Sequence, residues 1–311
     1  MKTAMIGLGD IAEKAYLPVL AAQPALDLHL CTRNEARLDR LGDAYRIGAR
    51  YTSVDDVIKA GIEAAFVHAA TDAHPEIVEA LLSAGIHVYV DKPIAYTLAE
   101  SERLVHLARA QDRSLMVGFN RRHAPGYAGL AAHPRHLIVM EKNRHNLPDN
   151  PRRAVFDDFI HVADTLRFLA PGEITGTSIR TRVRDGLIEH IVLELSGDGF
   201  TAIGVMNRMS GASEETCEAM GEGAKRRVVN LGDVIDYQGG ETLARRPDWV
   251  PVAGQRGIEQ VSLEFLAAVR EGRRIDAADA LATHALCEEI VQAAEYRAGV
   301  QAAEGAVSAS G

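Results

Sequence analysis

The chain has 311 residues, enough for one large α/β domain or for two domains of ordinary size. Hydrophobic residues make up 47% and charged residues 25%, which is typical of globular proteins and excludes a disordered, collagen-like or coiled-coil chain. The formal net charge of −9 argues against a general nucleic-acid-binding protein, because such proteins present a basic face.

Cysteine usage and hydropathy indicate a soluble, cytoplasmic protein. Cys31, Cys217 and Cys287 are far apart and odd in number, so they predict neither a disulfide framework nor a zinc motif. No apolar run approaches the ~20 residues that cross a bilayer. The first apolar run is soon interrupted by Asp10, so we expect no signal peptide and no membrane partner.

The first third of the chain alternates short apolar runs with amphipathic stretches. Helical patterns cover residues 75–83 and 98–110. Strands that alternate with helices predict βαβ units and a parallel sheet. The candidate strands are residues 3–7, 26–31, 64–68, 86–90 and 114–118.

After about residue 120 the pattern changes. A strand at 137–140 and a helix at 157–169 are followed by strand-like runs joined by glycine turns, and two helices close the chain. Consecutive strands joined by tight turns predict an antiparallel sheet. We therefore expect an α/β domain at residues 1–120 and an α+β domain at residues 121–311. The later strands are expected at 176–184, 187–195, 200–209, 214–221 and 225–231, and the helices at 257–270 and 277–296.

A glycine loop follows the first expected strand. In the sequence Gly7-Leu-Gly-Asp-Ile-Ala12, the glycines allow a tight turn and a close approach of a pyrophosphate to backbone N–H groups, and Ala12 packs on the strand. The strand–turn–helix context predicts a dinucleotide site. The alternatives are an ordinary βα turn and the similar loop of a methyltransferase.

The end of the second strand discriminates between cofactors. NAD sites usually place Asp or Glu there to bind the ribose 2′-hydroxyl, whereas this chain has Thr32 and Arg33, followed by Arg37 and Arg40. A hydroxyl and a guanidinium suit a 2′-phosphate, so we expect NADP(H) to be preferred, with NAD(H) as the alternative. These arginines could instead only solvate a helix face. The missing carboxylate also disfavours a methyltransferase.

Two further positions predict chemistry. Lys92 follows the fifth strand and so lies at the carboxyl edge of the sheet, where ligands of α/β proteins bind; a surface lysine is the alternative. Asp157, His161 and Asp164 stand one above another if this segment is a helix. A carboxylate beside a histidine orients the ring and raises its proton affinity, as acid–base catalysis needs. A capping aspartate and a half-buried histidine are the alternative.

Basic residues concentrate just past the first domain, at 121–122, 142–144 and 152–153. In an acidic protein this predicts an anionic or polyhydroxylated substrate. A solvated basic rim, or salt bridges to the other domain, is an equally open alternative. Several histidines show no ligand spacing with carboxylates or cysteines, so we interpret them as structural and expect no metal. They are His74, His87, His123, His133, His136 and His145.

Taken together, these motifs resemble the Gfo/Idh/MocA family of glucose–fructose oxidoreductase, inositol dehydrogenase and rhizopine catabolism. The motifs are the glycine loop, Asp-Lys-Pro at 91–93, Gly-Phe-Asn-Arg-Arg at 118–122 and Asp-x-x-x-His at 157–161, and they are closest to the MviM-like branch. The resemblance implies a Rossmann doubly wound parallel sheet followed by an α+β domain with an open, mostly antiparallel sheet. It also implies a homodimer or homotetramer.

The resemblance assigns roles by position. Lys92 matches a lysine that contacts nicotinamide and the reacting oxygen, Asp157 a substrate-binding aspartate, and His161 an acid–base histidine. With the residues derived above, the expected cofactor contacts are Gly7, Gly9, Asp10, Ile11, Ala12, Thr32, Arg33, Thr71, Lys92 and Asn120. The expected substrate contacts are Lys92, Arg121, Lys142, Arg144, Asp157 and His161.

We therefore predict an NADP(H)-dependent oxidoreductase acting on a sugar, polyol or related hydroxy compound. His161 would take the hydroxyl proton, Asp157 would orient it, and Lys92 would stabilise developing negative charge. A regulatory protein that binds the cofactor without turnover is the alternative, disfavoured because all three residues are present. Two positions depart from the family. Asp91 stands where glutamate is usual, and we expect its shorter side chain to shift Lys92. The loop at Thr71 lacks the common Thr-Pro pair.

Overall fold

The computed structural model describes the backbone of residues 1–308 and the side chains of residues 1–296. The chain forms two compact units. The first consists of Met1–Asn120 together with Pro251–Ala282, and the second of Arg121–Val250 together with the residues from Thr283 onward. The sequence analysis assigned residues 251–282 to the second domain, and the structure corrects this assignment.

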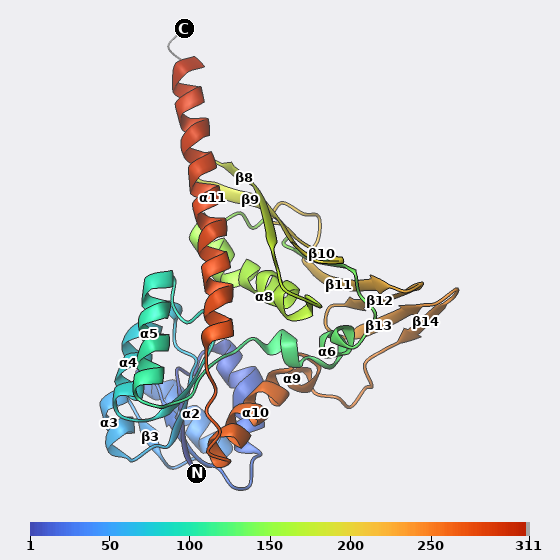
Figure 1. The fold of residues 1–311 in the computed structure, drawn as a ribbon. Helices are drawn as coiled ribbons and strands as arrows, with labels where there is room; N and C mark the ends of the chain where they lie inside the picture. The colour runs from blue at the N-terminus through green and yellow to red at the C-terminus, as the bar shows by residue number, and fades with distance from the viewer. Residues whose placement is uncertain (309–311) are drawn as a thin grey trace. The chain divides into compact units, whose positions relative to one another are not determined.

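A six-stranded parallel sheet with helices around it forms the first unit (Figure 1). The strand order is β3-β2-β1-β4-β5-β6. The order reverses between β1 and β4, as in doubly wound Rossmann sheets, so the predicted fold class is confirmed. The strands are β1 (Lys2–Ile6), β2 (Asp27–Cys31), β3 (Arg50–Tyr51), β4 (Ala64–Val67), β5 (His87–Val90) and β6 (Leu115–Val117).

Helices connect these strands, and three of them begin at capping side chains. Asn34, Ser53 and Thr97 each accept a hydrogen bond from the backbone N–H three residues later, which satisfies a helix-end donor. The α-helices of the first unit are α1 (Leu17–Ala21), α2 (Glu35–Tyr45), α3 (Val54–Lys59), α4 (His74–Ser83), α5 (Leu98–Ala110), α9 (Val252–Gln255) and α10 (Ile258–Arg270). Short π and 3₁₀ turns are η1 (Ala12–Tyr16), η2 (Thr71–Ala73) and η3 (Asn120–His123).

Helix α10 joins the first unit because its apolar face completes the core of the parallel sheet. The Phe265 ring lies 5.2 Å from the Phe66 ring and 5.8 Å from the Tyr89 ring, measured between centroids. Val261 and Leu266 belong to the same buried cluster. A fully buried large apolar side chain contributes about 1.5–3 kcal/mol, so this packing holds the late segment on the early sheet.

An eight-stranded sheet forms the second unit, in the order β14-β13-β12-β11-β7-β10-β9-β8. Its neighbours are antiparallel except for β10 and β7, which agrees with the predicted open, mostly antiparallel sheet. The strands are β7 (Leu137–Asn143), β8 (Gly176–Arg184), β9 (Leu187–Gly197), β10 (Phe200–Asn207), β11 (Glu214–Gly221), β12 (Ala224–Val229), β13 (Asp233–Tyr237) and β14 (Glu241–Ala244).

Helix α8 (Ile160–Leu169) packs directly on this sheet. A Cβ atom at Gly204 of β10 would lie 2.5 Å from Val162, so the glycine permits the close approach. The π-helical turn η4 (Ala154–Phe159) precedes α8 without a break. The other helices of the unit are α6 (Pro125–Ala131), α7 (Pro151–Arg153) and the part of α11 (Ala278–Ser308) after Ala282.

Two properties of the described residues bear on membrane and metal binding. No helix in this part of the chain is both long enough and apolar enough to cross a bilayer. Within the same residues, no three histidine, cysteine or acidic side chains are grouped to hold a metal ion. The three cysteines are buried, and they form no disulfide in the described part of the chain.

Candidate functional site

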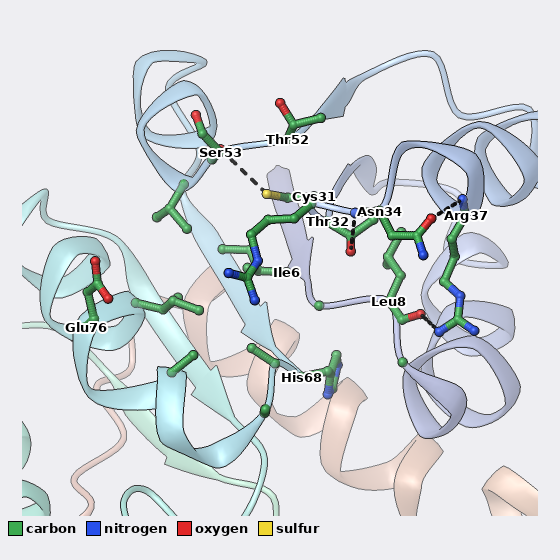
Figure 2. A pocket seen from close by; sticks show the side chains of 18 of the residues that line it. Ile6, Leu8, Cys31, Thr32, Asn34, Arg37, Thr52, Ser53, His68 and Glu76 are labelled. Carbon is green, nitrogen blue, oxygen red and sulfur yellow. Dashed lines mark hydrogen bonds between the residues drawn. The ribbon is translucent and has the colours of Figure 1, made fainter.

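A cavity of about 560 Å³ lies at the carboxyl ends of the strands of the first unit (Figure 2). Residues 52–55 and α4 contribute to its walls, which also include three loops, at residues 7–9 after β1, 32–34 after β2 and 68–70 after β4. These loops flank the point where the strand order reverses, which is where doubly wound sheets bind dinucleotides.

The glycine loop has the shape that a dinucleotide needs. Gly7 has a φ of +86°, and a Cβ atom there would lie 2.4 Å from the backbone N of Ala69, so no larger residue fits. A Cβ atom at Gly9 would meet nothing within 4 Å, so this loop leaves open space at the cavity. Backbone approach by a pyrophosphate requires both properties, and the loop therefore fits the predicted cofactor.

The remaining residues of the loop differ in position. Asp10 forms an exposed ion pair with Lys14 at 2.6 Å. Ile11 is 59% exposed, whereas Ala12 is buried in the core against the sheet. Ala12 thus has the packing role expected of the last position in the motif.

The four residues after β2 that were considered for binding a 2′-phosphate have different environments. Thr32 and Arg33 line the cavity. Arg37 also lines the cavity, but its Nη1 donates to the carbonyl oxygen of Leu8 at 2.8 Å and so braces the glycine loop (Figure 2). Arg40 forms a two-bond ion pair with Glu13. Arg33 therefore lines the cavity without the loop contact that Arg37 makes or the ion pair that Arg40 forms.

The end of β5 is held by neighbouring side chains. Lys92 is half-buried and precedes Pro93 through a cis peptide bond. The carboxylate of Asp91 accepts a hydrogen bond from Nδ1 of His68 at 2.7 Å. His68 also lines the cavity, so this pair connects the cofactor region with the strand end that carries Lys92.

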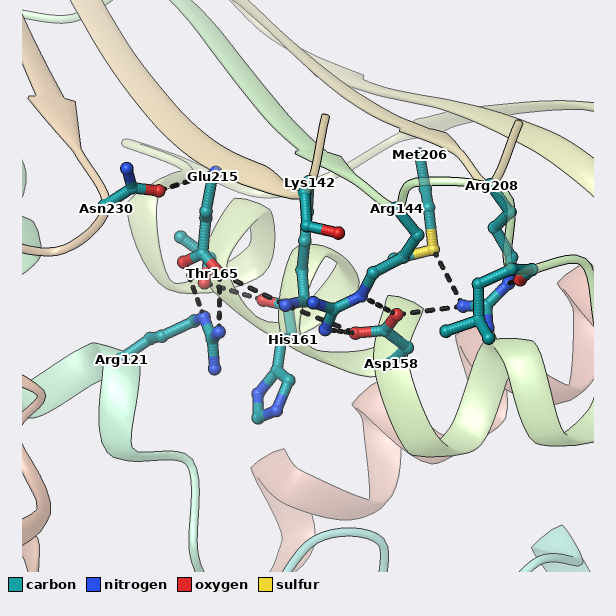
Figure 3. A network of polar contacts seen from close by, with 12 residues as sticks. Arg121, Lys142, Arg144, Asp158, His161, Thr165, Met206, Arg208, Glu215 and Asn230 are labelled. Carbon is teal, nitrogen blue, oxygen red and sulfur yellow. Dashed lines mark hydrogen bonds and ion pairs between the residues drawn. The ribbon is translucent and has the colours of Figure 1, made fainter. Parts of the chain in front are cut away.

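A buried network of charges lies in the second unit (Figure 3). Arg121 forms two hydrogen bonds to Glu215, at 2.8 and 2.6 Å, and the hydroxyl of Tyr127 donates to the same carboxylate at 2.9 Å. Lys142 lies between Glu215 and Asp158, at 3.3 and 3.2 Å. Burial raises the pKa of Glu215, but the charge of Arg121 outweighs it, and the pKa falls to about 2.

Asp158 is the second anion of this network. It accepts two hydrogen bonds from Arg144, at 2.7 and 2.6 Å, and one from Arg208 at 2.9 Å. Burial opposes ionisation of Asp158, but the guanidinium groups and Lys142 hold its pKa well below the ordinary range. Burial and the nearby Arg121 lower the pKa of Lys142. Four cations thus surround two carboxylates.

The helix expected to carry the acid–base pair begins as the π-helical turn η4. Asp157 and His161 are both half-buried, and Figure 3 shows the His161 side chain projecting from its helix beside the network. Asp164 is 1% exposed and is held by two hydrogen bonds from Arg122, at 2.9 and 2.6 Å, and one from Thr283 at 3.1 Å. This carboxylate therefore links α8 to Arg122 and Thr283 inside the second unit.

Known proteins resemble both parts of the chain. Residues 1–119 match the family described as an oxidoreductase family with an NAD-binding Rossmann fold, and residues 127–237 match the YceM-like C-terminal domain. The protein YceM of Salmonella typhimurium is 31% identical over 279 residues, which cover 87% of this chain and 90% of the relative. The chain belongs to the Gfo/Idh/MocA family of oxidoreductases.

Two crystal structures extend this likeness to the whole fold. A Gfo/Idh/MocA family oxidoreductase of Vibrio cholerae has a TM-score of 0.87 and 33% identity, over 94% of this chain and 98% of the other. The dehydrogenase MviM of Clostridium difficile has a TM-score of 0.89 and 30% identity, over 94% of this chain and 99% of the other. Membership of this NAD-binding family therefore covers both units.

Two positions inferred from the Gfo/Idh/MocA resemblance have local structural partners. Thr71 begins the turn η2, beside the cavity-lining residue Ala70. Asn120 is 9% exposed, and its amide donates to the carbonyl oxygen of Arg256 at 2.7 Å. The Asn120 side chain thus ties the end of the parallel sheet to the segment that leads into α10.

Several residues that hold the predicted site residues in this Gfo/Idh/MocA fold were not predicted from the sequence. Glu215 and Asp158 bind three of the predicted basic residues, and His68 binds Asp91. A signal for His68 was present, because it is the last residue of one predicted strand and Asp91 follows the parallel neighbour of that strand. For Glu215 the sequence offers no comparable signal, since its partners are more than seventy residues away.

Proposed function

We propose that this oxidoreductase is an NADP(H)-preferring dehydrogenase or reductase acting on CH–OH groups of a sugar, polyol or related hydroxy compound. The cavity beside the glycine loop supports this proposal most directly, because Thr32 and Arg33 line it where NAD enzymes usually have a carboxylate. A guanidinium and a hydroxyl in these positions suit a 2′-phosphate. A bound nicotinamide dinucleotide would supply or accept the hydride.

The chain's own residues have distinct proposed roles. The imidazole of His161 takes the proton of the substrate hydroxyl during oxidation and returns it during reduction. The ammonium of Lys92 donates a hydrogen bond to the substrate oxygen and stabilises its developing negative charge. Asp157 binds a neighbouring hydroxyl or orients His161. These roles come from the family resemblance and from the positions of the three residues after β5 and at the start of α8.

The charge network supports an anionic substrate. Arg121, Lys142 and Arg144, proposed as substrate contacts, belong with Arg208 to a set of four cations around two carboxylates. The side chain of Arg144 is 32% exposed, so it is the member best placed to meet a ligand. The two buried carboxylates fix the cations in position, which reduces the reorganisation needed when an anion binds.

Fluorescence titration with NADPH and NADH tests the cofactor proposal. We expect NADPH to bind more tightly, and the Arg33→Ala variant to lose the difference. Arg180→Ala, an exposed arginine of the second unit, is the control and should keep it. Equal affinities for the two nucleotides in the unchanged protein would contradict the proposed preference.

A substrate screen tests the chemistry. Sugars, polyols and sugar acids are incubated with NADP⁺, and turnover is compared in His161→Ala and Lys92→Ala. We expect oxidation of a sugar acid or another anionic compound and loss of turnover in both variants. The regulatory alternative predicts nucleotide binding without turnover of any compound, and undiminished turnover in both variants would overturn the assigned roles.

We also propose a cytoplasmic location and a homodimer or homotetramer. Three buried cysteines that form no disulfide among the described residues support a reducing compartment. The family resemblance supports the oligomer. Light scattering during size-exclusion chromatography measures the assembly directly, and a monomer would contradict this part of the proposal.

A further inference from the structure

The carboxyl ends of β4 and β5 bring a histidine and an aspartate together. The two strands are parallel, with Val67 opposite Val90, so His68 and Asp91 are the next residues on each strand. The backbone N–H of Asp91 donates to the carbonyl oxygen of Val67 at 3.0 Å. The side chains then meet through Nδ1 of His68 and a carboxylate oxygen of Asp91, at 2.7 Å.

This pair is enclosed by aromatic rings. The His68 side chain is 1% exposed, and its ring centroid lies 4.1 Å from that of Tyr16. The hydroxyls of Tyr16 and Tyr89 are 2.9 Å apart beside it. Burial raises the pKa of Asp91, but the charge of His68 and its hydrogen bond outweigh burial, so the pKa falls below the ordinary value. Asp91 is therefore a carboxylate at neutral pH.

A second histidine holds the other side of the same strand end. His74 is 1% exposed, with Nδ1 2.9 Å from the carbonyl oxygen of Pro93 and Nε2 3.0 Å from that of Ala69. Carbonyl oxygens only accept hydrogen bonds, so a neutral ring donates to one of them and a protonated ring to both. Burial lowers the pKa of His74, against the effect of these carbonyls and of Asp91. A protonated ring, or a neutral ring with its hydrogen on Nδ1, donates to Pro93 and so joins the β4 loop to the β5 end.

Lys92 thus lies between Asp91, which is bonded to His68, and Pro93, which faces His74. We propose that His68 and His74 are positioning residues for Lys92, and that the hydrogen bond from His68 directs the Asp91 carboxylate away from the lysine. The aspartate that replaces the family's usual glutamate is one methylene shorter, and His68 supplies the partner that fixes this shorter carboxylate. The inference rests on the proposed role of Lys92.

The titration of Lys92 tests this inference without a substrate. Lysines are converted to ¹³C-dimethyl-lysine, which keeps the charge, and their signals are followed by NMR as pH rises. The chain has six lysines, so Lys92→Arg identifies the signal. In His68→Leu the carboxylate of Asp91 loses its imidazole partner and attracts the Lys92 ammonium. The proton affinity of Lys92 should then rise about tenfold, since one pKa unit is a tenfold change.

Three further variants separate positioning from general destabilisation. His68→Asn keeps a donor for Asp91 and should titrate like the unchanged protein. In an Asp91→Asn background, His68→Leu should leave the Lys92 titration unchanged, because the carboxylate is gone. His29→Leu is the matched control, since His29 is also a buried histidine of the same sheet, 6% exposed on β2, with Tyr51 as its partner. It should not move the Lys92 signal.

The outcomes distinguish this inference from the proposed function. If Lys92 titrates identically in His68→Leu and the unchanged protein, or if His29→Leu shifts it equally, the inference is overturned. Should His68→Leu fail to fold, His68→Phe decides, because it keeps a ring among the neighbouring aromatic side chains but has no donor for Asp91, and an unaltered Lys92 titration there also overturns the inference. If the signal responds as expected but no compound is turned over, the positioning stands and the proposed function fails.

Discussion

Glu215 is a buried carboxylate whose negative charge balances the cations around it. Its carboxylate is 8% exposed and meets Arg121, Lys142 and Tyr127. Removing one partner of a buried network leaves the others without compensation, which costs more than the interaction itself contributes. The sequence allowed Arg121 and Lys142 to be predicted as residues of a polar site. Their carboxylate partner Glu215 could not be predicted, because it meets them only through the register of β11 with β7.

The Glu215→Gln substitution therefore has a predictable pH dependence. The pKa of Glu215 falls from an ordinary value of 4.5 to about 2 in the folded chain. A lowered pKa stabilises the fold above the unfolded value, and this stabilisation is lost as pH falls through the folded value. We expect Glu215→Gln to lower the free energy of unfolding by about 3 kcal/mol at pH 7. Denaturant melts should show the deficit shrinking below pH 4.5.

Glu264→Gln is the control for that measurement. Glu264 pairs with Arg273 at 2.9 Å, but both side chains are more than 40% exposed. Exposed ion pairs contribute little, so this variant should unfold like the unchanged protein. A constant difference between Glu215→Gln and the unchanged protein from pH 7 to pH 3 would contradict the assignment.

The two loop glycines should respond differently to alanine. Gly7→Ala meets backbone atoms at 2.4 Å with an unfavourable φ, so we expect a loss of about 2 kcal/mol in stability. Gly9→Ala adds a methyl group to open space, and its stability should change by less than about 0.5 kcal/mol. Because that space is proposed to admit a pyrophosphate, NADPH affinity should fall about tenfold in Gly9→Ala, the cost of one displaced charged hydrogen bond. Thermal melts and nucleotide titrations check both, and full affinity in Gly9→Ala would place the pyrophosphate elsewhere.

Elements were predictable where one face is buried and the other is not. Strand β9 and strand β10 alternate in burial and were expected close to their observed ranges. Strand β7 continues beyond the predicted Met140 because Lys142 points inward in the same alternation, and an inward lysine breaks an apolar pattern. Strand β14 has four exposed residues and was missed, since an edge strand with no buried face carries no alternation. The π-helical turn η4 likewise has no signature in a pattern of 3.6-residue period.

Helix α10 is the element whose place in the fold most changes an expectation. Its Phe265 is fully buried against Phe66 and Tyr89 of the parallel sheet. Phe265→Ala should lower the free energy of unfolding by about 3–5 kcal/mol, because it opens a cavity in that core. Trp249→Ala, at a side chain 95% exposed, should change it by less than about 0.5 kcal/mol. Denaturant unfolding followed by circular dichroism compares the two, and equal midpoints would contradict this packing.

At the scale of the whole molecule, the first unit is discontinuous in the chain. The predicted boundary near residue 120 rested on a change of pattern along the sequence, and that change does coincide with the passage from the parallel to the mostly antiparallel sheet. The pattern along the sequence did not predict that residues 251–282 belong to the first unit. An amphipathic helix shows that it needs a buried surface, but its sequence does not identify which sheet provides it.

This discontinuity predicts how fragments behave. A fragment of residues 1–120 exposes the apolar surface that α10 covers, including Phe66 and Tyr89, so it should aggregate or lack cooperative unfolding. A fusion of residues 1–120 to residues 251–282 through a flexible glycine–serine linker restores that cover and should unfold cooperatively. Circular dichroism melts of the two fragments make the comparison. The fusion should also bind NADPH, since the residues lining the cavity all precede residue 120. Cooperative unfolding of the shorter fragment would show that α10 is dispensable for the parallel sheet.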